Sequence, residues 1–395
     1  MDANLLSEIE ATFQSKGGAA ALDRLITELR ESGDYTSLFY ALLMRKRHEL
    51  GISPIPTGSS QDVPAEHHEA FENAIRESAR TAGQAFLDAG NIPQAWAFFR
   101  MIGEPAPIRK ALDAVDIDTA EDIESLVQIA YNEGIHPMRG FDWILARYGL
   151  CSAITTLGSQ ELPQAPAVRE HVVSRVVRTL YHELRERLAA ELERLGSPLP
   201  PEATYEADTP GVVSKLITGH DELFGEDSYH VDTSHLSSTV QLAMHLDPGP
   251  TLEMARELAQ YGASLRGRWS HPGDPPFQDL YPAAGRYLAI LAGDHVEENL
   301  TYFREQAEQA DPSEVGTFPA EVLVNLLLRL KRDPDALEVA RKYLSSPGGR
   351  RLSCPSVVEL CTKLGDYAAL AETAKTQGDA IHFMAGLLGD RSRKE

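Results

Sequence analysis

The sequence is poor in cysteine: its 395 residues include only three, Cys151, Cys354 and Cys361. Three scattered cysteines cannot build a disulfide framework, so we expect free thiols. Cys354 and Cys361 could share one face of a helix, but no further cysteine or nearby histidine joins them to suggest a zinc site. We therefore expect both to be buried thiols, because free cysteine generally prefers the interior.

Long apolar runs and an excess of basic charge are also lacking. No window approaches the roughly 18 uninterrupted apolar residues of a membrane helix, and the start, Met1-Asp2-Ala3-Asn4, lacks the basic and apolar segments of a secretory signal. Acids outnumber bases by 59 to 37, giving a formal charge of −22. A phosphate backbone or an anionic membrane would be repelled at long range. We expect a cytoplasmic protein with neither a membrane nor a nucleic acid as its main partner.

Alternating strand patterns are nearly absent, and helical patterns dominate. Apolar residues recur at spacings of three and four in segments of about 12 to 20 residues, separated by glycine or proline turns. Leu22, Leu25, Ile26 and Leu29 form one such stripe. The pattern predicts an all-α fold, an α/α solenoid or partial toroid of antiparallel helical hairpins with an irregular, loop-rich central region.

One kind of helix break recurs along the chain. It occurs at Gly33-Asp34-Tyr35, Gly90-Asn91-Ile92, Arg332-Asp333-Pro334 and Gly365-Asp366-Tyr367. Glycine, where present, suits a left-handed helix end, and the Asp or Asn can cap the next helix. Small residues that follow, namely Ala95, Ala336 and Ala369, would let the two helices of a hairpin approach closely.

These breaks resemble tetratricopeptide-type helical hairpins, notably in Phe86-Leu87-Asp88-Ala89-Gly90-Asn91 with Ala95-Trp96 and in Leu364-Gly365-Asp366-Tyr367 with Ala371. The resemblance covers about a third of the chain, at its two ends, without a regular 34-residue period. It implies an α-solenoid. We expect N-terminal hairpins over 1–134, a central His-rich region over 135–290 and C-terminal hairpins over 291–395, or all three as one continuous domain.

The central region carries the residues with the most chemical potential. Four of the 13 histidines, His220, His230, His235 and His245, lie between Leu216 and Leu246 among several acids. Neutral imidazoles with a carboxylate suit zinc, iron or manganese, which makes His230, His235, Asp232 and His182 candidate ligands of a divalent transition metal. No HExxH or paired CxxC element is present. Metal-free acid/base chemistry or anion binding, and purely structural histidines, therefore remain open alternatives.

Three further features point to a pocket in the central region. His136 before Pro137 is expected at a helix junction. His171, Arg175, Arg178 and His182 line one side of a predicted helix over 168–195, either as a solvated face or as a site for an anionic ligand. Arg268 and Trp269 lie in a basic, Pro-rich loop, which is either a binding loop or a rigid connector.

Two functional classes follow from these residues. The first is a helical enzyme or small-ligand-binding protein for an acidic or polar molecule, with His136, His182 and His235 as catalytic candidates and Arg175, Arg178, Arg268 and Trp269 as ligand-binding candidates. The second is an interaction scaffold that binds a protein on its concave face. The first requires the central histidines to converge in a closed cavity, whereas the second predicts scattered histidines and an open groove. We favour the first slightly, because the middle region departs from the hairpin pattern.

Overall fold

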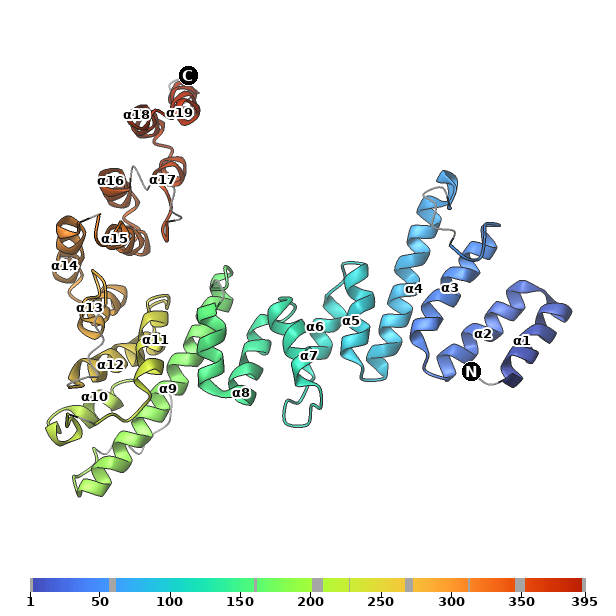
Figure 1. The fold of residues 1–395 in the computed structure, drawn as a ribbon, viewed down its shortest axis with the longest axis horizontal. Coiled ribbons are helices and arrows are strands. Elements are labelled where there is room, and N and C mark those ends of the chain that lie inside the picture. Colours follow the sequence, from blue (N-terminus) through green and yellow to red (C-terminus); the bar gives the residue numbers. More distant parts are fainter. Residues whose placement is uncertain are drawn as a thin grey trace. The chain divides into compact units, whose positions relative to one another are not determined.

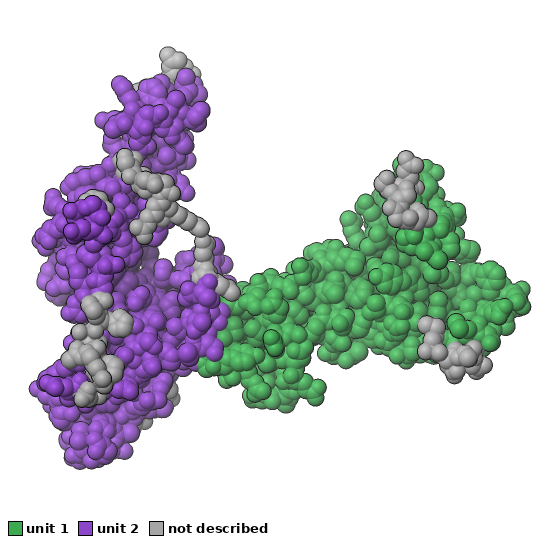
Figure 2. Space-filling model, in the orientation of Figure 1, with its two compact units in different colours: residues 1–149 green, residues 150–395 purple. Residues whose placement is uncertain are grey.

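The computed structural model describes residues 3–56, 62–159, 162–200, 209–226, 228–266, 273–311, 313–344 and 352–392. Throughout these ranges the secondary structure is helical and no strand is formed, which confirms the all-α prediction. The chain divides into two compact units, unit 1 over Met1–Gly149 and unit 2 over Leu150–Glu395 (Figure 2). The division into 1–134, 135–290 and 291–395 stays a prediction.

Unit 1 is a succession of helices, and from α1 to α6 each helix packs against the next (Figure 1). Its elements are α1 (Ala3–Lys16), α2 (Gly18–Glu31), α3 (Tyr35–Glu49), the short η1 (Ala65–His67), α4 (His68–Asp88), α5 (Ile92–Met101), α6 (Ala106–Asp113), α7 (Ile123–Val127), the π-helical turn η2 (Gln128–Asn132) and the first part of α8 (Pro137–Ser159). Phe39, Ala79, Ala82 and Phe98 form one core cluster of α3, α4 and α5. The helices thus bury their apolar stripes locally, between chain neighbours.

Helix α8 contains the point at which the two units meet in the sequence. Gly149 has φ 78° and ψ −179°, a conformation outside the helical range. Side chains with a Cβ rarely adopt such a φ, so glycine is required for the kink. The sequence over 141–157 has a continuous apolar helical pattern, which does not predict a break at this residue. Gly149 splits the helix, and unit 2 begins directly after it.

Unit 2 starts with the second part of α8, after Gly149, which is followed by a long helix and then by a helical succession. Its elements are α9 (Pro166–Leu195), α10 (Val212–Ile217), the short η4 (Asp221–Leu223), α11 (Thr233–Ala243), α12 (Pro250–Ser264), α13 (Leu280–Ala292), α14 (Val296–Gln309), α15 (Phe318–Arg329), α16 (Asp333–Tyr343), α17 (Val357–Leu364), α18 (Tyr367–Gln377) and α19 (Ala380–Ser392). Helix α9 packs against α10, α11 and α12, and from α12 to α19 each helix packs against the next. The apolar residues of α9 between Val172 and Leu188 form one face, which is completely buried.

The recurring helix breaks behave as predicted at three of their four positions. Gly33, Gly90 and Gly365 adopt positive φ angles. The following Asp34, Asn91 and Asp366 side chains accept hydrogen bonds from Ser37, Gln94 and Ala369 backbone N–H groups, respectively. Each pair therefore ends one helix and caps the next, as its chemistry suggests.

The fourth break works differently. Lys331, with φ 59°, takes the left-handed position, and Arg332 rather than Asp333 precedes the helix. Asp333 lies inside α16 and forms an ion pair of 2.8 Å with Lys363. The prediction that Asp333 caps α16 is therefore wrong, because the helix begins one residue earlier than Pro334 suggests. Ala336 is fully buried there, as predicted.

The three cysteines test a further prediction about the framework. Cys354 and Cys361 are buried free thiols, which confirms the expectation, whereas Cys151 is exposed. Within the described helices, none is both long enough and apolar enough to cross a membrane.

Candidate binding grooves

His230 is held by a tyrosine from α12. The hydroxyl of Tyr261 accepts a hydrogen bond from the His230 backbone N–H over 2.8 Å and lies 3.0 Å from the ring Nδ1. Burial lowers the pKa of His230, and the charge of Arg187 adds to that effect while Glu191 opposes it. A neutral imidazole that accepts from the tyrosine explains this arrangement. The described contacts of His230 therefore hold it in place within the fold.

Asp232 is engaged in capping helix α11. Its Oδ1 accepts hydrogen bonds from the backbone N–H of Ser234 at 2.8 Å and of His235 at 3.1 Å, and from the hydroxyl of Ser234 at 2.5 Å. The Ser234 hydroxyl is the largest cause of the lowered pKa of Asp232. The sequence left open whether this acid binds a metal or caps the helix, and the geometry shows it as the cap.

His136 belongs to unit 1, while His182, His230 and His235 belong to unit 2. The Nε2 atom of His136 lies 2.8 Å from Oδ1 of Asp113, at the junction that precedes α8. This position at a helix junction was predicted from the following Pro137. The contact ties the end of α6 to the start of α8.

The polar side of α9 takes part in helix packing through Arg178. Arg178 donates from Nε to the hydroxyl of Thr251 on α12 over 3.1 Å. His182 is half-buried and its ring lies edge-on to that of Tyr181, 6.0 Å away. Arg175 is exposed. The stripe thus lies partly against α12 and partly toward solvent.

The candidate metal ligands do not assemble in the part of the chain that the structure describes. Across those residues, no group of three or more His, Cys, Asp or Glu side chains is arranged to hold a metal ion. The zinc, iron or manganese site stays a prediction. Arg268 and Trp269 lie outside the described residues, so the predicted binding loop stays a prediction as well.

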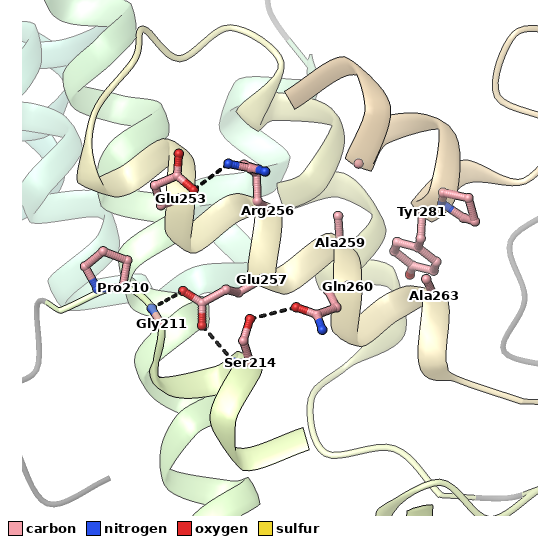
Figure 3. A pocket seen from close by; sticks show the side chains of 12 residues that line it. Pro210, Gly211, Ser214, Glu253, Arg256, Glu257, Ala259, Gln260, Ala263 and Tyr281 are labelled. Carbon is pink, nitrogen blue, oxygen red and sulfur yellow. Dashed lines mark hydrogen bonds and ion pairs between the residues drawn. The ribbon is translucent and has the colours of Figure 1, made fainter. Parts of the chain in front are cut away.

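A pocket of about 570 Å³ lies among α10, α12 and α13, and we call it the α12 pocket. Figure 3 shows the helix α12 side chains that face it, with α10 on one side and Tyr281 of α13 on the other. It is lined by Pro210, Gly211, Ser214, Glu253, Arg256, Glu257, Ala259, Gln260, Ala263, Tyr281, Pro282 and Gly285.

Glu257 fixes the α10 wall of the α12 pocket. Its carboxylate accepts from the backbone N–H groups of Gly211 and Ser214, the latter at 2.9 Å (Figure 3). It also accepts from the hydroxyl of Tyr181 at 3.0 Å. The carboxylate is almost completely buried. These donors replace the hydrogen bonds to water that a carboxylate loses on burial. Glu257 therefore anchors the start of α10 to α12.

The opposite wall of the α12 pocket depends on a close approach of α12 and α13. A Cβ atom at Gly262 would lie 2.4 Å from Cδ1 of Tyr281. Only glycine leaves room for this ring. Arg256, at the rim, bridges Glu253 and Asp294 at 2.7 Å each, so both carboxylates at the pocket mouth are paired with one guanidinium. The pocket is thus a depression whose acids are engaged by protein partners, Glu253 by Arg256 and Glu257 by the start of α10.

Unit 1 contains a second and larger depression, of about 780 Å³, which we call the α5–α7 groove. Its lining comes from α5, α7, the π-helical turn η2 and the end of the first part of α8. The residues are Pro93, Trp96, Asp122, Glu124, Ser125, Val127, Gln128, Ile129, Asn132, Glu133 and Tyr148. π-Helical turns often occur at functional sites, because they displace side chains from the regular helical positions.

One wall of the α5–α7 groove is fixed by Trp96. Its indole Nε1 donates to Oε2 of Glu133 over 2.8 Å, and the same carboxylate oxygen lies 3.2 Å from the guanidinium of Arg100. The turn η2 that leads to Glu133 is held against α8, since a Cβ at Gly140 would lie 2.7 Å from the Tyr131 backbone nitrogen. The indole is therefore oriented on the groove wall.

The other side of the α5–α7 groove is acidic. Asp122 caps α7 by accepting from the Ser125 backbone N–H over 3.2 Å, and the Ser125 hydroxyl is the largest cause of its lowered pKa. Glu124 is exposed on the first turn of α7. Tyr148 is 46% exposed and completes the lining. The groove thus combines two aromatic side chains with three carboxylates.

The sequence interpretation missed both depressions. Trp96 and Glu133 are 37 residues apart, and no local pattern joins residues at such a distance. The signal that was available is the closeness of Asp122 and Glu124 in the sequence, and such pairs of acids are common on protein surfaces. Comparison of the chain with protein-family models, with curated proteins and with solved structures gives no match.

Proposed function

We propose that this protein is an α-solenoid interaction scaffold, which binds a segment of another protein in the α5–α7 groove. The observation that carries the proposal is the groove itself: an oriented indole, an exposed tyrosine and an acidic side around a depression of about 780 Å³. Tryptophan and tyrosine are the residues that most often anchor protein interfaces. An open depression of this size accommodates side chains of an extended or helical segment.

The packing order supports the solenoid part of the proposal. In unit 1 from α1 to α6, and in unit 2 from α12 to α19, each helix packs on the next. Such neighbour-to-neighbour packing is the basis of helical-repeat proteins, whose extended surfaces bind partners. The resemblance to tetratricopeptide hairpins points the same way and stays an expectation.

The enzyme hypothesis has less geometric support. His136 contacts Asp113, His230 contacts Tyr261, and Asp232 caps α11. Each of these contacts stabilises a local junction of helices. A catalytic role for His136, His182 and His235 stays a prediction, as do Arg175 and Arg178 as ligand-binding residues.

The experiment is a quantitative co-purification of the full chain from the cells that make it, comparing the wild type with Tyr148→Ser. Tyr40→Ser is the matched control, because Tyr40 is an exposed tyrosine of unit 1 outside the groove. We expect a set of proteins to be lost with Tyr148→Ser and retained with Tyr40→Ser. Equal recovery of every protein in all three samples would contradict the proposal.

A further inference from the structure

The α5–α7 groove also indicates the chemistry of its occupant. We infer that the groove binds a basic, lysine- or arginine-rich segment of a partner protein, with its apolar side chains against Trp96 and Tyr148 and its cations beside Asp122 and Glu124. This inference rests on the proposed scaffold function. It adds the class of partner, which the fold alone does not supply.

Two of the three carboxylates around the groove have no cationic partner among the described residues. Glu133 pairs with Arg100, whereas within the described residues no cationic side chain pairs with Asp122 or Glu124. The Asp122 carboxylate caps α7 by accepting from an uncharged backbone N–H group. Its negative charge is therefore not neutralised at the groove. A cation placed there gains attraction without first displacing a salt bridge.

The aromatic side chains favour the same occupant. Trp96 and Tyr148 are part of the groove lining, and aromatic ring faces attract guanidinium and ammonium groups as well as apolar side chains. Arginine in particular combines stacking on a ring with bidentate hydrogen bonds to a carboxylate. Ring and carboxylate lie along one depression here, which fits both parts of such a side chain.

The net negative charge of the whole chain adds a long-range attraction for basic segments. A formal charge of −22 attracts cationic segments and speeds their association. It also attracts any basic peptide without regard to site. The test must therefore separate the groove from the overall charge.

The experiment is isothermal titration calorimetry of the purified full chain with three short peptides of equal length. The first alternates leucine pairs with lysine and arginine, the second replaces each basic residue with glutamine, and the third replaces each with glutamate. The groove variant is Asp122→Asn with Glu124→Gln. Asparagine keeps the cap of α7, so the variant removes two charges and preserves the fold.

The control variant is Glu66→Gln with Glu72→Gln, two exposed acids of unit 1 outside the groove. It has the same net charge as the groove variant. We expect the basic peptide to bind the wild type and the control variant alike and the groove variant about tenfold more weakly, through the loss of two charge interactions in a partly screened site. We expect the glutamine and glutamate peptides to bind more weakly than the basic one.

Each other outcome has a definite meaning. Equal weakening in both variants would show attraction by overall charge and overturn the inference. Binding of the glutamine peptide as tightly as the basic one, with loss in Tyr148→Ser, would overturn the basic class and keep the scaffold function. No binding of any peptide would also overturn the inference, and the co-purification experiment would then decide the scaffold function separately.

Discussion

The hydroxyl of Tyr181 on α9 donates to Oε2 of Glu257 on α12 over 3.0 Å, and it also accepts from the backbone N–H groups of Val212 and Val213 at 3.3 Å each. One hydroxyl and one carboxylate thus satisfy the first N–H groups of α10 from two other helices. Helix ends leave such groups without intrahelical partners. Tyr181 and Glu257 therefore fix the position of α10, which forms one wall of the α12 pocket.

Tyr181→Phe should lower the free energy of unfolding by about 1–2 kcal/mol, because it leaves buried donors and part of a buried carboxylate unsatisfied. Urea or thermal denaturation of the full chain measures the loss. Tyr40→Phe is the control, since Tyr40 is exposed and its change should be close to zero. Equal stability of Tyr181→Phe and the control would contradict the described network.

Glu257→Gln should cost more, about 2–3 kcal/mol, because the amide replaces an acceptor oxygen with a donor facing backbone N–H groups. Urea denaturation of the full chain, followed by circular dichroism, measures the loss in free energy of unfolding. Glu253→Gln changes a neighbouring acid of the same helix that is 43% exposed in its ion pair with Arg256. An exposed pair contributes little, so a loss in Glu253→Gln as large as in Glu257→Gln would argue against the special role of Glu257.

Gly262→Ala should destabilise unit 2 by about 1–3 kcal/mol, because the new Cβ would overlap the ring of Tyr281 and force α12 and α13 apart. Gly285→Ala on α13 is the matched control, since no atom lies within 4 Å of its Cβ position. Alanine in a helix interior is favoured over glycine by about 0.5–1 kcal/mol. We expect opposite signs for the two variants in thermal unfolding, and a stabilising Gly262→Ala would refute the close approach.

His230 should make the stability of unit 2 depend on pH. Its pKa is lowered by burial, so as the pH falls below the ordinary value of 6.5 the unfolded chain takes up the proton before the folded chain does. The contribution of His230 to the free energy of unfolding is therefore fully present above this range and is lost as the pH falls through it.

Urea denaturation of the wild type and of His230→Gln at about pH 7.5 and 5.5 measures this contribution. The two proteins differ only at residue 230, so the difference between them reports on His230. We expect the wild type to lose more stability on acidification than the variant. An equal loss in the two proteins would show that burial does not lower the pKa of His230.

The sequence predicted the fold class because helix formation and helix ends depend on residues that are close in the chain. The apolar stripe of α9 and the caps at Asp34, Asn91 and Asp366 are examples, since each depends on spacings within a few turns. The kink at Gly149 was not predicted, because its flanking residues continue an apolar helical pattern and glycine alone does not break one.

The grooves were not predicted, because they depend on contacts between residues far apart in the chain. Glu257 and Tyr181 are 76 residues apart, and their sequence neighbours are those of ordinary surface helices. The interpretation instead emphasised the histidines, whose closeness in sequence suggested closeness in space. His230 and Asp232, two residues apart, have separate partners in the fold, Tyr261 for the first and the α11 backbone for the second.

The most direct test of the scaffold function is photocrosslinking within living cells, with a benzoylphenylalanine residue in place of Tyr148 and, separately, in place of Tyr40. Both side chains are exposed in unit 1, so both variants report on proteins near that unit, and only the first reports on the α5–α7 groove. The account predicts a discrete protein adduct at Tyr148 that is missing at Tyr40, with the crosslink in a lysine- or arginine-rich segment of the partner. No adduct at Tyr148, or the same adducts at both positions, would contradict it.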